Sequence, residues 1–200
     1  IAQIEAGCRG ALPNVAHRLI AALDQEKALV CVLTQNVDGL HRAAGSRNVI
    51  EIHGTVHRLY CMSCGQGRRV EDYAGLAIPP ECPRCGGVMR PEVVLFGEAL
   101  PERAIERLES VLGQGVDAVV SIGTTSVFPY IAGPVRWAAQ QGVPTVEINP
   151  GETQVSALAR GATLQALRTQ GWRLRQGGEL LQAPARASDD PAALGVQDLV

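Results

Sequence analysis

The sequence lacks three features that would place the protein in a membrane, outside the cell or on a nucleic acid. No apolar stretch approaches the roughly eighteen residues that a membrane-spanning helix needs. No basic segment is followed by the short apolar run of a secretory leader. No run of like charge is longer than a pair, and 18 basic against 20 acidic residues give a formal net charge of -2. We therefore expect no membrane association and no nucleic-acid partner, because a nucleic-acid surface needs clustered positive charge.

Most of the cysteines belong to one spacing pattern. Of the six cysteines, four form two Cys-x-x-Cys pairs, Cys61 with Cys64 and Cys82 with Cys85. Two such turns supply four thiolates at the spacing of a zinc ribbon, and nearby glycine and proline favour tight turns. The alternative is free or disulfide-linked thiols. Because no further ligand suggests an open coordination position, the pattern predicts one structural Zn²⁺, and metal-bound thiols favour a reducing, cytoplasmic setting.

Apolar, β-prone runs that end in polar residues predict a parallel sheet. Each run is followed by amide, hydroxyl or imidazole side chains, and helical periodicity fills the intervals between runs. The predicted strands are residues 28–34, 49–52, 117–122 and 145–148, and the predicted helices are residues 14–26, 101–112 and 131–141. Strands that alternate with helices are typical of an α/β fold, here a Rossmann-like, doubly wound parallel sheet.

The composition changes twice along the chain. Residues 54–91 are rich in cysteine, glycine, proline and arginine, which predicts a small zinc-binding module stabilised by its metal. We expect this module to be inserted in a Rossmann-like domain made of residues 1–53 and 92–182. Residues 183–200 are rich in alanine, proline, aspartate and serine, which predicts a disordered tail.

Two predicted strands in the first half of the chain end in polar side chains. His53 follows one strand, and Gln35, Asn36 and Asp38 follow another. The carboxyl ends of parallel strands form the edge where such sheets bind ligands. A histidine has a pKa suited to a general base. The alternative is that His53 is only a strand-end histidine hydrogen-bonded to the backbone. The amide and carboxylate groups suit a ribose or a carboxamide, and an Asx-turn that caps the next short helix is compatible with that role.

Two predicted strands in the second half end in a similar way. Gly123-Thr124-Thr125-Ser126 offers backbone N–H groups and hydroxyls to a diphosphate or a ribose, although such loops are common. Asn149 is suited to ribose hydroxyls or to capping a turn with Pro150 and Gly151.

Five motifs together resemble those of the sirtuins, the NAD-dependent protein-lysine deacylases, in a bacterial-like form. The motifs agree in order and spacing from about Pro13 to Asn149. They are Thr34–His41, Glu51–Gly54, the cysteine quartet, Arg90–Glu98 and Ile122–Val127. The resemblance implies removal of acyl (acetyl) groups from protein lysine, with nicotinamide and O-acyl-ADP-ribose as products.

The resemblance also implies a role for each matched residue. His53 corresponds to the general base that takes a proton from a ribose hydroxyl. Residues implied to bind NAD are Gln35, Asn36, Val37 and Asp38 on the nicotinamide side, Gly123, Thr124, Thr125 and Asn149 at the adenine-side ribose, and Gly177 near the adenine. Residues implied to bind the acyl-lysine peptide and to line an apolar tunnel for its side chain are Val94, Phe96 and Gly97.

One family feature does not occur in these residues. The first strand and the glycine-rich loop Gly-Ala-Gly-Ile-Ser are absent, and with them the diphosphate cradle and the positions that set acyl preference. Our leading hypothesis is a sirtuin represented without its first segment. The alternatives are a catalytically impaired sirtuin that acts as a zinc-bearing acyl-peptide binding module, and an NAD hydrolase or ADP-ribosyl transferase that uses the same pocket.

Overall fold

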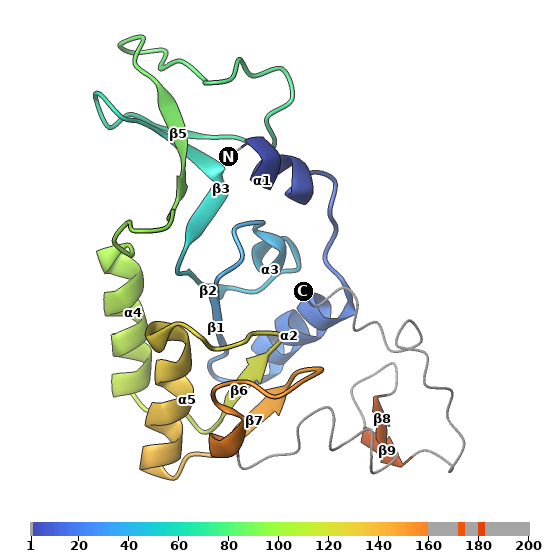
Figure 1. Ribbon diagram of the computed structural model, residues 1–200. Coiled ribbons are helices and arrows are strands. Elements are labelled where there is room, and N and C mark those ends of the chain that lie inside the picture. The colour runs from blue at the N-terminus through green and yellow to red at the C-terminus, as the bar shows by residue number, and fades with distance from the viewer. Residues whose placement is uncertain (1, 160–171, 175–179, 183–200) are drawn as a thin grey trace. The chain divides into compact units, whose positions relative to one another are not determined.

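The computed structural model describes residues 2–159, 172–174 and 180–182 (Figure 1). By their internal contacts the residues group into two compact units, Ile1–Ser110 and Val111–Val200, and each unit is described by itself. The predicted cofactor residue Gly177 and the predicted tail 183–200 lie outside the described residues.

The first unit begins with helices and a parallel strand pair. Its elements up to the second strand are α1 (Ala2–Cys8), α2 (Val15–Glu26), β1 (Cys31–Thr34), α3 (Leu40–Ala43) and β2 (Asn48–Glu51). Strands β1 and β2 pair in parallel, with Cys31 opposite Asn48 and Thr34 opposite Glu51. Their carboxyl ends therefore lie side by side, as the sequence predicted. The Asn14 side chain accepts a hydrogen bond from the His17 N–H at 3.1 Å and so caps the start of α2.

Three details of this region differ from the prediction. Strand β1 begins at Cys31 and not at residue 28, because Lys27 still donates its N–H to the Leu23 carbonyl and closes α2. The first three residues of β1 are only partly buried, because β1 pairs with β2 alone among the described strands. Helix α1 was not predicted at all.

The zinc-binding segment folds as a three-stranded antiparallel sheet in the order β4-β3-β5. The strands are β3 (Gly54–Cys61), β4 (Gly67–Arg69) and β5 (Met89–Val93). One face of the sheet covers a small core made of Leu59, Cys61, Val70, Tyr73, Cys82 and Met89. Since this core contains two of the four predicted ligands, metal binding and apolar packing are joined in one cluster.

Helix α1 is fastened to this segment by a buried glutamate. Glu5 is 3% exposed, and its carboxylate accepts the backbone N–H of Tyr73 at 3.2 Å and the guanidinium of Arg9 at 2.9 Å. The neighbouring Arg9 guanidinium lowers the pKa of Glu5. The Tyr73 hydroxyl donates to the Val56 carbonyl at 3.0 Å, so the loop after β4 is hydrogen-bonded on both sides.

The second unit contains another parallel strand pair. Helix α4 (Glu102–Gly113) crosses the boundary between the units, and the second unit continues with β6 (Val119–Ile122), α5 (Pro129–Gln141), β7 (Thr145–Ile148) and the 3-10 turn η1 (Ser156–Leu158). Strands β6 and β7 pair from Val119 with Thr145 to Ile122 with Ile148. Gly142 ends α5 with a φ of 72°, in the left-handed region where glycine is favoured. Strands β8 (Trp172–Leu174) and β9 (Leu180–Gln182) form an antiparallel pair that was not predicted.

In this unit α5 supplies much of the core, with Ala132, Val135 and Val155 packed together. Over all the described residues, no helix is long and apolar enough to cross a membrane.

Candidate functional site

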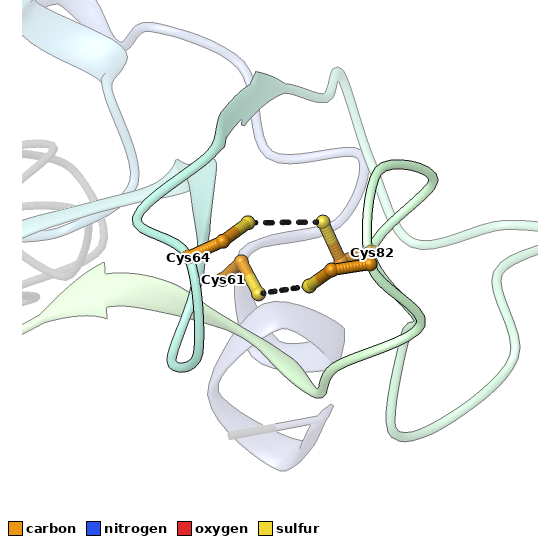
Figure 2. Close-up of side chains that lie close together, drawn as sticks. Cys61, Cys64 and Cys82 are labelled. Carbon is orange, nitrogen blue, oxygen red and sulfur yellow. Dashed lines mark hydrogen bonds between the residues drawn. The ribbon is translucent and has the colours of Figure 1, made fainter.

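The four predicted metal ligands converge on one point. The sulfur atoms of Cys61, Cys64, Cys82 and Cys85 all lie within 4.8 Å of one another. Figure 2 shows Cys61 and Cys64 facing Cys82 across the cluster. The sulfurs of Cys61 and Cys85 are 3.5 Å apart, and those of Cys64 and Cys82 are 3.7 Å apart. Tetrahedral zinc with Zn–S bonds of about 2.3 Å places its sulfurs about 3.8 Å apart, whereas a disulfide needs about 2.05 Å. The quartet therefore fits zinc and is not disulfide-linked.

The two knuckles have the same backbone turn. Gly65 donates its N–H to the Cys61 carbonyl at 3.0 Å, and Gly86 donates to the Cys82 carbonyl at 2.9 Å. Both glycines have a positive φ, 71° and 70°, that other residues adopt at a cost. The Cys-x-x-Cys-Gly repeat is thus the local signal that aims two thiolates at one ion.

The surroundings of Cys61 favour the ionised form of its thiol. Backbone N–H groups of Cys64 and Ser63 point at its sulfur, the latter at 3.4 Å, and they lower the pKa of Cys61 to about 6. A Cβ on Gly87 would lie 3.2 Å from this sulfur and 2.6 Å from the Ser63 hydroxyl, so glycine keeps the space around the thiolate open. A thiolate surrounded by N–H donors is the form that binds zinc.

The polar segment after β1 is shaped by its own side chains. Asn36 donates its N–H to the Thr34 hydroxyl at 3.1 Å, and Leu40 donates to the Asp38 carboxylate at 2.9 Å. The second bond is the predicted Asx-turn at the start of α3. His57 fixes the same turn from outside, because its Nε2 lies 2.9 Å from the Asp38 carbonyl oxygen. Sequence reasoning missed His57, since a lone histidine within a strand carries no signal of such a contact.

The start of β3 brings three predicted segments together. Val37 accepts the Val56 N–H at 3.0 Å, and the His53 carbonyl accepts the Val94 N–H at 2.9 Å. The His53 ring is hydrogen-bonded to the backbone carbonyl of Gln35. Residues on the predicted nicotinamide side, the predicted base and the predicted peptide loop are therefore linked through four consecutive residues, 53–56.

The ionisation of His53 suits a base. Burial lowers the pKa of its imidazole, and the hydrogen bond to the Gln35 carbonyl opposes that effect without cancelling it. The ring nitrogen that bonds the carbonyl carries the proton, which leaves the other nitrogen as the acceptor. His53 is thus neutral at pH 7 with a defined accepting side.

The predicted peptide loop follows β5, and its predicted residues differ in their surroundings. Glu98 folds the loop back: its carboxylate accepts the Leu95 N–H at 2.9 Å and both terminal nitrogens of Arg90, at 2.6 and 3.0 Å. Val94 borders a hollow of about 250 Å³ whose other lining residues include Tyr60, Glu92 and Pro101. Phe96 is fully exposed, so in this structure it does not line an apolar tunnel with Val94. Gly97 has a φ of 84°.

In the second unit the ends of β6 and β7 meet as predicted. Asn149 donates its side-chain N–H to the Thr124 carbonyl at 2.7 Å, and Gly123 donates to the Ile148 carbonyl at 2.9 Å. Thr125 accepts the Gln154 N–H at 3.5 Å. The four predicted adenine-side residues of the described chain therefore share one edge of this strand pair.

Ser126 is an unusual member of the same loop. It is 1% exposed, has a positive φ of 53°, and its hydroxyl has no hydrogen-bond partner among the described residues. Strain of this kind gathers at ligand-binding loops. Backbone strain leaves no trace in a single sequence, which is why Ser126 was not singled out.

Comparisons with known proteins agree on one family. A profile of the Sir2 family matches residues 3–129. NAD-dependent protein deacylase 2 of Pseudomonas aeruginosa is 48% identical over 159 residues, which cover 78% of this chain and 62% of the relative. NAD-dependent protein deacylase 2 of Pseudomonas syringae pv. tomato is 51% identical over 160 residues, which cover 78% and 64%. The chain thus spans less than two thirds of the length of these curated relatives.

Solved structures give the same result. A Sir2 homolog–NAD complex is 38% identical with a TM-score of 0.72, and the match covers 78% of this chain and 60% of the other. A Sir2–p53 peptide–NAD⁺ structure is 32% identical with a TM-score of 0.70, covering 82% and 71%. These likenesses, with the parallel strand pairs and the cysteine cluster, confirm the predicted Rossmann-like α/β fold with a zinc-binding module.

Proposed function

The chain belongs to the Sir2 family, and from this premise we propose that the protein removes acyl groups, such as acetyl, from protein lysine with NAD as co-substrate. The products would be nicotinamide, free lysine and O-acyl-ADP-ribose. One observation carries the proposal: residues 53–56 hydrogen-bond both the Val37 segment and Val94, and the His53 ring bonds the Gln35 carbonyl. The names and ligands of the similar proteins support the same reaction.

His53 has the properties that a general base needs. Its lowered pKa favours the neutral ring at pH 7, and because the ring nitrogen that bonds the Gln35 carbonyl carries the proton, the other nitrogen is the acceptor. In the proposed reaction that nitrogen takes the proton of a ribose hydroxyl. When bound, NAD supplies the ribose carbon that the acyl oxygen attacks as nicotinamide leaves.

The binding roles are proposed residue by residue. Those on the nicotinamide side are Gln35, Asn36, Val37 and Asp38. Those at the adenine-side ribose are Gly123, Thr124, Thr125 and Asn149, and Gly177 is proposed near the adenine. The peptide would bind along Val94, Phe96 and Gly97, where an exposed Phe96 offers apolar surface to a neutral acyl-lysine.

The cysteine quartet has a structural role in this scheme. A zinc ion on Cys61, Cys64, Cys82 and Cys85 would hold together residues 54–91, a module that in the sequence is inserted between residues 1–53 and 92–182 of the Rossmann-like domain. Thiolate ligands that require reduced cysteine support a cytoplasmic location.

A turnover assay tests the proposal. The chain is incubated with NAD and either an acetyl-lysine peptide or the same peptide with free lysine, and nicotinamide is measured. Release that depends on the acetyl group and is lost in His53→Ala supports the proposal, provided that His53→Ala keeps the wild-type melting temperature. Peptide binding without turnover indicates a binding module, and NAD loss that does not need the peptide indicates a hydrolase. Either result refutes the deacylase.

A further inference from the structure

The outer face of the β4-β3-β5 sheet carries two arginines that face each other. In the register of β3 and β4, Arg58 lies opposite Arg69, and both side chains are exposed. Directly opposite residues of an antiparallel pair project from the same face of the sheet. The two guanidinium groups therefore share one surface, away from the core that Leu59 enters from the other face.

The hydrogen-bond pattern makes this pair a close one. Cys61 donates its N–H to the Gln66 carbonyl, and Val70 donates to the His57 carbonyl. Hydrogen-bonded pairs alternate with pairs that lack hydrogen bonds along an antiparallel ladder, so Arg58 and Arg69 form a pair of the second kind. Side chains come nearest to each other at such pairs, and like charges placed there repel.

The arginines on this face differ in whether a carboxylate neutralises their charge. Arg58 forms an ion pair with Glu92, and Arg90 forms one with Glu98 while its guanidinium carbon lies 5.8 Å from the centre of the Tyr60 ring. Among the residues that the structure describes, Arg69 has no ion pair. The face therefore keeps one uncompensated positive charge beside a second guanidinium, which is the arrangement that binds a carboxylate from two sides.

We propose that Arg69 and Arg58 bind an acidic side chain of the peptide substrate. The proposal rests on the deacylase function above and adds a substrate class to it: acyl-lysine in a sequence with aspartate or glutamate near by. The sheet leads directly to the peptide loop, because β5 continues into Val94 and the order β4-β3-β5 places Arg69 two strands from that edge.

The spacing sets where the acidic residue must stand. Strands lie about 4.8 Å apart, so β4 is about 10 Å from β5. An extended peptide covers about 3.3 Å per residue, so about three residues cross that distance. An aspartate or glutamate directly beside the acyl-lysine is too near to reach Arg69.

A peptide fits this face better than a nucleic acid does. Two carboxylates, Glu92 and Glu98, border the arginines and would repel a row of phosphates. The Arg90 guanidinium already lies over the Tyr60 ring, where a base would otherwise stack. The whole chain carries a formal charge of -2.

The test measures dissociation constants by fluorescence anisotropy for the full chain. Four peptides combine acetylated or free lysine with glutamates or glutamines three to five residues away, each at low and high salt. We expect glutamates to tighten binding about fivefold at low salt, with a smaller gain at high salt. Arg69→Ala should abolish that gain. Arg68→Ala is the matched control, since Arg68 is the adjacent exposed residue on the opposite face of the same strand and removes the same charge.

A stability readout separates this role from a structural one. Arg69→Glu should raise the melting temperature, because it replaces repulsion across the strands with attraction to Arg58, while it abolishes the preference for acidic peptides. A lowered melting temperature would mean that Arg69 supports the fold, which overturns the proposal.

Three other results overturn it as well. They are an equal loss in Arg68→Ala and Arg69→Ala, no preference for glutamate in the wild-type chain, and Arg69-dependent binding of a single-stranded oligonucleotide that exceeds peptide binding. The acetyl comparison keeps the two proposals apart. A glutamate preference without any dependence on acetylation or nicotinamide release refutes the deacylase and retains an acidic-peptide surface.

Discussion

Replacing Gly54 with alanine should damage the link between the predicted base and the predicted peptide loop. Gly54 follows His53, pairs with Val93 across β3 and β5, and has a φ of 78°. An alanine Cβ would lie 1.8 Å from the Glu92 carbonyl oxygen, whereas real Cβ atoms essentially never come within 3.0 Å of another heavy atom. The backbone of β5 must therefore move by more than about 1 Å, away from the hydrogen bond between Val94 and His53.

The expected loss of stability in Gly54→Ala has two parts. A non-glycine residue in the left-handed region costs about 1–2 kcal/mol. Overpacking of a well-packed position adds about 1–3 kcal/mol, and here the obstacle is a backbone carbonyl that cannot change rotamer. The sum of about 2–5 kcal/mol corresponds to a loss of about 4–20 °C in melting temperature for a chain of this size.

A second glycine of the same module, Gly75, allows the backbone cost to be measured apart from the overpacking cost. Gly75 is exposed, has a φ of 73°, and a Cβ there would meet nothing within 4 Å. Gly75→Ala should therefore show the backbone cost alone, about 2–8 °C. The assay is calorimetry of both variants, with hydrogen exchange at the Val94 amide, which should accelerate only in Gly54→Ala. Equal melting temperatures for the two variants would refute the reasoning.

Three further predictions concern the metal, the base and the core of the module. A chelator should release about one zinc per chain and lower the melting temperature, and Cys82→Ser should bind less than one equivalent; a gently purified chain without metal would contradict this. In the pH profile of peptide-dependent nicotinamide release, the acid limb should have its midpoint below pH 6.5, because a lowered pKa keeps His53 neutral, and thus able to accept a proton, to lower pH. An acid limb above the ordinary histidine range excludes His53 as the base. Tyr73→Phe should cost about 1–2 kcal/mol in urea unfolding, because the Val56 carbonyl loses its 3.0 Å hydrogen bond; unchanged stability would show that water replaces the hydroxyl.

The features that could be predicted from the sequence depend on short-range signals. The knuckle turns need only two cysteines with two residues between them and glycine after the second, and the cap of α2 needs only Asn14 before an apolar period. The carboxyl ends of β1 and β2 meet because parallel pairing aligns them whatever else surrounds the strands. The first two outcomes are fixed within a few residues of their signals, and the third follows from parallel pairing itself.

The features that were missed depend on contacts between distant residues. Helix α1 contains a glycine and ends two residues before another, and the bond from Tyr73 to Glu5 that fastens it spans 68 positions in the sequence. The exposure of Phe96 is set by how Glu98 folds the loop back toward Arg90, which residue type does not reveal. The role of Arg69 depends on the register that places it opposite Arg58, and register is not written in either strand alone.

The four residues at the start of β3 give the molecule a property beyond the placing of His53. Because backbone bonds tie them to Val37 on one side and to Val94 on the other, neither neighbouring segment can become ordered without restricting the other. A ligand that immobilises the first segment has then already removed part of the conformational entropy that a ligand of the second must lose. If ligands bind both segments, we expect their occupancies to be thermodynamically linked, and reciprocity then requires each ligand to raise the affinity for the other by the same factor.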